Sequence, residues 1–380
     1  MNILLLSHGI NKKYNDNYYA YSYMCNLGDN ILAITQRENI NKGNRAEISP
    51  GFEMDGNLQI YRLFDTVKKQ KSIINNILIY YKIKKIVSKF KPDIIFCEEL
   101  GNMMLAIKLK KEFNIPIVLR VEFLFDKNNP YRTMGRTLKF FKNRFTGDYL
   151  STTIGHSIWN FACNHSAAVI SCYFGDVAKF NNLKNNYFHY VPWATSSPKI
   201  KYSNNKVKDR AIFIGSFDRH KNLKELEKTL PLLFEFTPLK EFWIVGEGDD
   251  LDVVNNLKAL YPEKIRHITF LSRHECLELI RDSYFTYSPA TRGGWGFIGD
   301  SWAMKTPVLV THNHYNFRDG IDSIVANPAV IVGKVNELYR DNTLYDKILN
   351  EAFNRYIENY TAESVGQKYH NICMSVLNNW

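Results

Sequence analysis

Long hydrophobic runs are scarce in this 380-residue sequence. It begins MNILLLSHGINKK, where the apolar run covers only residues 3–6 and no basic segment precedes it. That pattern is typical of a short buried strand and not of a signal peptide. One long stretch, 149–175, lacks charge, but it carries polar side chains that are costly in lipid, namely His156, Asn160, Asn164 and His165. We therefore expect no membrane-spanning helix.

Cysteine is also sparse, and its spacing excludes two classes of protein. The six cysteines form no CxxC pair and no regular series; they are Cys25, Cys97, Cys163, Cys172, Cys276 and Cys373. A disulfide scaffold and a cysteine-based zinc site both need closer spacing. Most of the six lie among apolar residues, so we expect buried free thiols, a cytoplasmic protein, no metal site and no cofactor.

The chain is long enough for two domains, each with its own core. Short β-branched runs alternate with helical periodicity along both halves, which predicts an α/β fold with a doubly wound, mostly parallel sheet in each. In the first half we expect strands at 3–6, 30–34, 93–96, 117–121, 168–171 and 188–191, and helices at 72–90 and 103–113. In the second half we expect strands at 211–214, 242–245, 267–270, 285–287 and 308–310, helices at 223–234, 251–260 and 275–281, and a helical tail from 345.

A polar segment without periodicity, TSSPKIKYSNNKVKD, follows Pro192–Ala194 and is the best candidate for a linker. It predicts a first domain over 1–195 and a second over 196–355. The last residues, 356–380, form a helix that could pack back on the first domain.

The excess positive charge is confined to the first half. Residues 1–195 hold 26 Lys and Arg against 15 Asp and Glu, a net charge of +11, whereas the remainder is neutral. A fold does not require such asymmetry, so it indicates an anionic partner for the first half. The alternative is a chain that is simply rich in lysine.

Two glycine turns follow predicted strands of the second half. In GSFDRHKN, Gly215 lets the backbone approach a ligand, the next helix offers free N–H groups to a phosphate, and Arg219 and Lys221 add positive charge. In VGEGDD, Gly246 lies in a common strand-to-helix turn that is a weak signal alone, and the aspartates near the helix start are better explained as caps than as metal ligands. Both turns can otherwise be purely structural.

The most informative segment is RGGWGFIGDSWAMKTPV, over residues 292–308. Four glycines in seven residues make a loop whose amides can surround an anionic or hydroxylated ligand. Asp300 follows where a carboxylate can accept hydrogen bonds from ribose hydroxyls. The alternative is a structural turn with Asp300 as a helix cap.

In this order the motifs resemble the retaining GT-B glycosyltransferases of family 4, the "glycosyl transferases group 1" enzymes. Lys221-Asn222 is similar to the family's donor-diphosphate loop, residues 245–248 to its V-G-x-G turn, residues 270–274 to its base-binding turn, and residues 294–308 to its glutamate motif. The resemblance covers about 205–375 well and 90–195 more loosely. It implies two Rossmann-like domains and a nucleotide-diphospho-sugar donor.

The sequence departs from this family at several positions. Asp300 replaces the second glutamate of the motif, and Gly293 or Arg292 stands near the place of the first, which leaves the donor sugar open. Ser216 replaces an arginine, whose role we expect Arg219 to take, and Glu122 replaces a histidine of the first domain. Near the N-terminus, the usual Gly-Gly turn is reduced to Ser7-His8-Gly9.

The resemblance assigns site residues to three groups. Those expected to act in catalysis are Glu122, Lys221 and Arg219. Those expected to bind the donor are Gly215, Ser216, Gly246, Arg273, His274, Gly293, Gly294, Trp295, Gly296, Phe297 and Asp300. Those expected on the acceptor side are Ser7, His8 and Gly9.

The expected function is therefore a metal-independent glycosyltransferase that transfers a sugar, with retention, to a membrane-surface or lipid-linked glycan. Alternatives are transfer to a modified base of a nucleic acid, a sugar-nucleotide epimerase, or a degenerate relative that binds a sugar nucleotide or an anionic polymer without turnover. Residues 67–144 hold 18 Lys and Arg against 6 Asp and Glu. This segment favours peripheral docking on the inner face of a membrane, because its basic residues are mixed with aromatic residues and no nucleic-acid motif is present.

Overall fold

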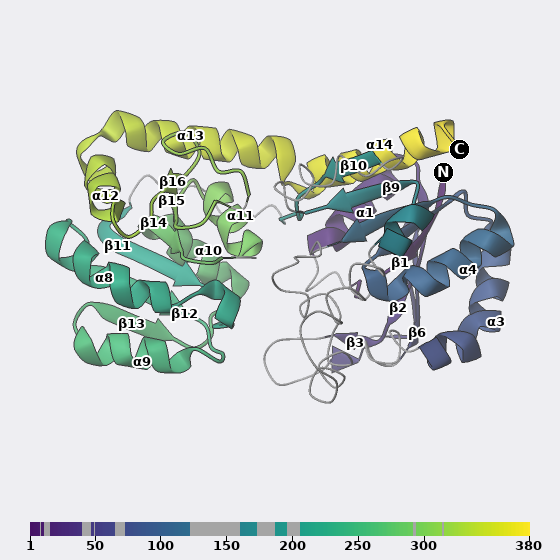
Figure 1. Cartoon of the computed structure of the whole chain (residues 1–380), viewed down its shortest axis with the longest axis horizontal. Helices are drawn as coiled ribbons and strands as arrows, with labels where there is room; N and C mark the ends of the chain where they lie inside the picture. The colour runs from purple at the N-terminus through teal and green to yellow at the C-terminus, as the bar shows by residue number, and fades with distance from the viewer. Residues whose placement is uncertain are drawn as a thin grey trace. The chain divides into compact units, whose positions relative to one another are not determined.

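The computed structural model of the chain describes residues 1–7, 9–10, 16–39, 47–48, 50–64, 73–121, 160–172, 187–195, 206–291, 294–313 and 315–380. They divide into two compact units, each a mixed α/β structure (Figure 1). Unit 1 comprises Met1–Ala194 and Ala362–Trp380, and unit 2 comprises Thr195–Thr361. Most of the predicted linker, 196–205, lies outside the described residues.

Unit 1 contains a large, mostly parallel sheet. Its strands are β1 (Asn2–Leu6), β2 (Asn30–Gln36), β5 (Phe52–Asp55), β6 (Leu58–Phe64), β7 (Ile94–Glu98), β8 (Ile117–Val121), β9 (Ala168–Ser171) and β10 (Tyr187–Tyr190). They pair in the order β10-β9-β8-β7-β1-β2-β6-β5, and only the edge pair β5–β6 is antiparallel. A separate short pair joins β3 (Glu38–Asn39) to β4 (Glu47–Ile48).

Helices cover both faces of this sheet. The labelled helices of unit 1 are α1 (Asp16–Asn26), α3 (Ile73–Phe90), the 3₁₀ turn η1 (Leu100–Asn102), α4 (Met103–Phe113) and α14 (Ala362–Asn378). On β1, Leu4 and Leu6 point into the core shared with α3 and α4, and Ile3 and Leu5 into the core shared with α1 and α14. A strand that is buried on both faces needs a continuous apolar run, and this is why β1 could be predicted.

Unit 2 contains a six-stranded sheet whose strands are all parallel. Its elements are β11 (Val207–Ile214), η3 (Arg219–Lys221), α8 (Lys224–Phe236), β12 (Glu241–Val245), α9 (Leu251–Leu260), β13 (Ile265–Ile268), α10 (Arg273–Asp282), β14 (Ser283–Ser288), α11 (Trp295–Ala303), β15 (Val308–Val310), β16 (Ile324–Val325), α12 (Ile331–Arg340) and α13 (Asn342–Asn359). The strand order is β13-β12-β11-β14-β15-β16. This is the 3-2-1-4-5-6 order of a doubly wound dinucleotide-binding sheet. The predicted fold class is therefore confirmed.

The helical tail consists of two helices that belong to different units. α13 ends at Asn359 in unit 2, whereas α14 lies beside α1 in unit 1 (Figure 1). The contact between α1 and α14 is close at Gly366, where an added Cβ would lie 2.5 Å from the carbonyl oxygen of Ala20 and 3.1 Å from the ring of Tyr23. Glycine at this position therefore permits the close approach of the two helices.

Gly366→Ala should lower the free energy of unfolding by about 1–3 kcal/mol, because overpacking outweighs the gain of about 1 kcal/mol in helix propensity. Gly333→Ala is the matched control, since Gly333 lies within α12 and its added Cβ would meet no described atom within 4 Å. The control should be neutral or stabilising in urea denaturation. Equal effects of the two substitutions would refute the packing argument.

The cysteine prediction is confirmed, because all six cysteines are free and four of them are buried. Burial raises the pKa of the Cys25 thiol to about 12 and of the Cys276 thiol to about 11. Among the described helices, none has the length and apolar character needed to cross a membrane.

Candidate functional site

The strand order locates a candidate site in unit 2. The order of the strands along the sheet reverses between β11 and β14. In open parallel sheets, ligands bind beyond the carboxyl ends of the strands at such a switch point. The loop after β11 (215–222, here the β11 loop) and the loop after β14 (289–294, here the β14 loop) both start at this edge. Most of the predicted donor-binding residues belong to these two loops or to α11, which follows them.

Hydrogen bonds join the two loops. The backbone N–H of Thr291 donates to the carbonyl oxygen of His220 at 3.0 Å, and the amide of Asn222 donates to the carbonyl of Pro289 at 3.3 Å. Asn222 has φ of 55°, in the left-handed region that asparagine tolerates better than most residues. This explains why Asn suits the position after Lys221. The two loops therefore form one structure around the switch point.

The side chain of Lys221, a residue of η3, reaches the start of α11. A Cβ built on Gly294, the N-cap residue of α11 with φ of 81°, would lie 3.8 Å from Lys221 Nζ. The ammonium group thus lies near the N-cap of α11, and both the ammonium and the N-terminal end of a helix favour negative charge. Arg219 is exposed and lies two residues before Lys221 in the same 3₁₀ turn, η3, and Ser216 Oγ donates to Asp218 Oδ2 at 2.6 Å. The structure thus brings Lys221 and Gly294 together, and their role in binding an anion stays a prediction.

Gly296 supports the same interpretation. It is exposed in the first turn of α11, and an added Cβ would meet no described atom within 4 Å. The packing of the protein does not require glycine there, whereas the close approach of a ligand to the helix start would. Gly293 and Arg292 lie outside the described residues.

Trp295 and Phe297 differ from this pattern because their side chains are buried. The Trp295 ring stacks on Tyr360 with centroids 4.1 Å apart, and the Phe297 ring meets Phe213 edge-on at 5.7 Å. Donor contacts at these two positions would therefore come from backbone groups. Donor binding at Trp295 and Phe297 stays a prediction.

Gly246 has a packing role in this structure. With φ of 138°, it approaches the β11 loop so closely that an added Cβ would lie 1.9 Å from the carbonyl oxygen of Gly215. Gly248 is similarly close, with an added Cβ 2.9 Å from the backbone nitrogen of Phe217. Both glycines let the turn after β12 pack against the β11 loop. A contact of Gly246 or Gly215 with a donor stays a prediction.

Asp300 and Arg273, which are far apart in the sequence, form a bidentate ion pair. Arg273 Nη2 lies 2.9 Å from Asp300 Oδ1, and Nη1 lies 3.2 Å from Oδ2. Asp300 is the sixth residue of α11, so the alternative that it caps this helix is wrong, and Gly294 holds the N-cap position. The cap of α10 is Ser272, through a capping box with Glu275. His274 is 71% exposed in its side chain and lies near Glu278, away from this pair.

Asp300→Asn should raise the donor dissociation constant about tenfold or more while changing the unfolding free energy by under about 1 kcal/mol, because its Arg273 partner is half-exposed and can be solvated by water. Arg273→Gln breaks the same pair from the other side and is the matched variant. Calorimetric binding and urea denaturation of both variants test this. A large loss of stability with unchanged donor affinity would assign Asp300 a structural role.

Unit 1 has a polar cluster at its own switch point, between β1 and β7. Glu98 ends β7 and accepts hydrogen bonds from Ser7 Oγ and from the Tyr21 hydroxyl. Arg120 Nη1 lies 2.9 Å from Glu98 Oε1, and Arg120 Nε donates to the Tyr369 hydroxyl at 2.7 Å. Burial, followed by the charge of Glu98, raises the pKa of Tyr21. All five side chains are buried, so they form an internal charged network.

This network changes the interpretation of Ser7. Its side chain is bound to Glu98 and is only 1% exposed, so it supports the network and does not reach an acceptor directly. Gly9 lies beside Ser7, and the backbone N–H of Gly9 donates to Ser7 Oγ at 3.3 Å. His8 and Glu122 lie outside the described residues. Sequence reasoning missed Glu98 and Arg120, although a charged residue within or at the end of an apolar strand was the available signal.

Comparisons of the sequence with known proteins find no match. No protein-family profile matches the chain, and no curated protein matches it in sequence.

Among the described residues, no group of three or more His, Cys, Asp and Glu could hold a metal ion.

Solved structures are similar in fold over nearly the whole chain. Sucrose-phosphate synthase from Thermosynechococcus elongatus matches with a TM-score of 0.73 and 12% identity, covering 100% of both chains. HepE from Anabaena, solved in complex with UDP-glucose, matches with a TM-score of 0.65 and 11% identity over 99% of this chain and 100% of that one. A trehalose-6-phosphate protein from E. coli, bound with UDP-2-fluoro glucose, has a TM-score of 0.68 and 10% identity over 98% and 99% of the two chains. At these identities the likeness shows the fold: the chain has the GT-B fold of these glycosyltransferases.

Proposed function

We propose that this protein is a glycosyltransferase that takes a sugar from a nucleotide-diphospho-sugar. The observation that carries the proposal is the ammonium of Lys221 near Gly294, the N-cap residue of α11, at the switch point of a sheet with the 3-2-1-4-5-6 strand order. HepE, with the same fold, is described in complex with UDP-glucose, which supports a uridine-diphosphate sugar as the first donor to test.

Each group of the site has a role in this proposal. Lys221 and Arg219 neutralise the diphosphate, and the free amides at residues 294–296 bind its oxygens or the sugar. Asp300, held by both nitrogens of the Arg273 guanidinium, accepts hydrogen bonds from the ribose hydroxyls. Because these groups are fixed before the donor binds, they stabilise the charge that grows on the leaving diphosphate.

The reaction breaks the bond between the anomeric carbon and a diphosphate oxygen and forms a bond to an acceptor hydroxyl, whose proton is released. By likeness to retaining GT-B enzymes, the acceptor attacks on the face that the diphosphate leaves. We propose Glu122 as a group that orients an acceptor or donor hydroxyl. No metal ion is needed, because the lysine and arginine supply the positive charge.

For the acceptor we propose a membrane-surface or lipid-linked glycan, with the protein on the cytoplasmic side of the membrane. The excess positive charge of the first half supports an anionic partner. In α3, Lys82, Lys85 and Lys89 are exposed, and Tyr81 is 81% exposed beside them. Such a surface suits an anionic partner.

The proposed activity is tested with a panel of sugar nucleotides, scoring slow hydrolysis of the donor without acceptor. We expect turnover of at least one donor by the wild type and its loss in Lys221→Ala. Lys224→Ala is the control, since it removes the same charge from an exposed position three residues later. Binding of a donor with no hydrolysis in any condition would instead indicate a degenerate binding protein.

A further inference from the structure

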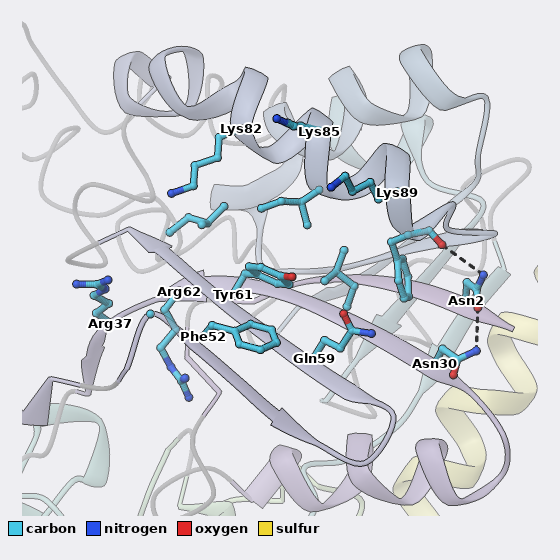
Figure 2. A pocket seen from close by; sticks show the side chains of 15 residues that line it. Asn2, Asn30, Arg37, Phe52, Gln59, Tyr61, Arg62, Lys82, Lys85 and Lys89 are labelled. Atoms are coloured by element: carbon cyan, nitrogen blue, oxygen red, sulfur yellow. Dashed lines mark hydrogen bonds between the residues drawn. The ribbon is translucent and has the colours of Figure 1, made fainter.

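A groove on unit 1 is separate from both switch-point clusters. It encloses about 1000 Å³ between α3 and the edge strands of the sheet. Its residues come from the starts of β1 and β2, from the end of β2, from β5 and β6, and from one side of α3 (Figure 2). None of them belongs to the donor site, which lies in unit 2.

The groove exists because α3 leaves part of the sheet uncovered. The residues of β6 alternate: Leu58 and Ile60 are buried in the core shared with α1, whereas Gln59, Tyr61 and Leu63 point to the other face and are half-buried. On that face α3 packs its buried Ile83 and Val87 on the core. The partly exposed face of β6 therefore becomes the floor of the groove.

Aromatic rings form part of this floor. Phe52 of β5 stands opposite Tyr61 of β6, and their ring centroids are 4.7 Å apart with the planes tilted by 50°. Phe52 is 49% exposed, which is high for a phenylalanine on a sheet. Such rings offer a flat apolar surface to a ligand that has an apolar face of its own.

Positive charge lines the wall and one end. Lys82, Lys85 and Lys89 project from one side of α3, and Arg37 lies at the end opposite to Asn2 and Asn30 (Figure 2). No described carboxylate forms an ion pair with these three lysines, whereas Lys84, on another side of α3, pairs with Glu112. Arg62 also lines the groove, but Glu53 neutralises it at 2.8 Å. None of the described residues that line the groove is acidic, so this lining is complementary to a ligand with several negative charges.

We propose that this groove binds an acidic glycan chain. This rests on the proposed glycosyltransferase function, because the chain would be part of the acceptor. The carboxylate or phosphate groups of the glycan pair with the lysines and Arg37. The C–H faces of its sugar rings pack on Phe52 and Tyr61, and Gln59 and Asn30 offer amides to hydroxyls. Between Asn30 and Arg37 the strand spans roughly 23 Å, enough for a short oligosaccharide. A flat bilayer cannot enter such a concavity, so the groove fits a polymer chain better than a membrane.

The test is direct binding without any donor, with a fluorescent oligogalacturonate as the acidic probe. Comparison probes are a neutral maltooligosaccharide, inorganic polyphosphate, duplex DNA, and vesicles of phosphatidylcholine with phosphatidylglycerol. We expect salt-sensitive binding of the oligogalacturonate, and weaker binding of the other probes. Lys82→Gln with Lys85→Gln and Lys89→Gln should weaken it about tenfold or more. The control variant, Lys208→Gln with Lys258→Gln and Lys347→Gln, removes the same charge from exposed positions of unit 2 and should bind like the wild type.

A second variant separates ring stacking from charge alone. Phe52→Ala, on an exposed edge strand, should weaken oligogalacturonate binding several-fold and leave polyphosphate binding unchanged. Wild-type affinity in the triple-lysine variant would overturn the proposal. So would preferential binding of polyphosphate, DNA or vesicles. Lys221→Ala should bind the glycan normally, because the donor site lies in unit 2. Glycan binding by a wild type that hydrolyses no donor would refute only the transferase function.

Discussion

Lys221→Ala should lower kcat/KM for the sugar-nucleotide donor by about 30- to 1000-fold, which corresponds to about 2–4 kcal/mol of transition-state stabilisation. The ammonium group lies at the start of α11, where the leaving diphosphate gains charge, and alanine leaves only the helix amides to balance that charge. The measurement is steady-state kinetics of donor hydrolysis and transfer, with urea denaturation to confirm that the variant is folded.

Lys224→Ala provides the comparison for this variant. It removes one positive charge from the first residue of α8, so any general effect of net charge would be the same. Its kinetics should stay within about twofold of the wild type, because the charge of an exposed lysine outside the β11 loop is largely screened by solvent. Equal losses in the two variants, or unchanged kinetics in Lys221→Ala, would remove Lys221 from the site.

Arg120→Met should lower the free energy of unfolding by about 3–5 kcal/mol, because it leaves the buried Glu98 carboxylate without its cation. Arg120 is 1% exposed and also donates to Tyr369 of α14, so its loss weakens the attachment of the last helix to the sheet. The measurement is urea denaturation followed by circular dichroism.

The double variant Arg120→Met with Glu98→Gln distinguishes a charge effect from a packing effect. Removing the carboxylate charge as well should recover a substantial part of the loss, since no uncompensated charge then stays buried. A double variant as unstable as the sum of the two single variants would contradict the account, because it would mean that the pair is not coupled.

Some elements could be predicted because their local pattern agrees with the fold. β1 and β7 are apolar runs buried on both faces, and α9 begins at Leu251 as its periodicity indicated. By contrast, α1 has the sequence DNYYAYSYMCN, which shows no apolar stripe, so its helix depends on packing against the sheet and α14. The edge hairpin β5–β6 was also missed, although the Gly56-Asn57 turn between its strands is typical of a hairpin.

The candidate site shows the same limit at the level of side chains. The sequence located Lys221 and Asp300 in their loop and helix, but it could not show that Arg273, 27 residues before Asp300, pairs with it. It also could not show that the Trp295 ring is buried or that Gly246 touches the β11 loop. The network of Glu98, Arg120 and Tyr369 joins residues up to 249 positions apart, and no local pattern predicts such a contact.

The central claim is that the switch point of unit 2 binds the diphosphate of a nucleotide, and calorimetric titration with UDP, GDP and ADP tests it most directly. We expect the wild type to bind at least one of them without added metal, Lys221→Ala to bind it about tenfold or more weakly, and Lys224→Ala to bind it like the wild type. If the wild type binds none of the three, or if Lys221→Ala binds as tightly as the wild type, the switch point of unit 2 is not the diphosphate site.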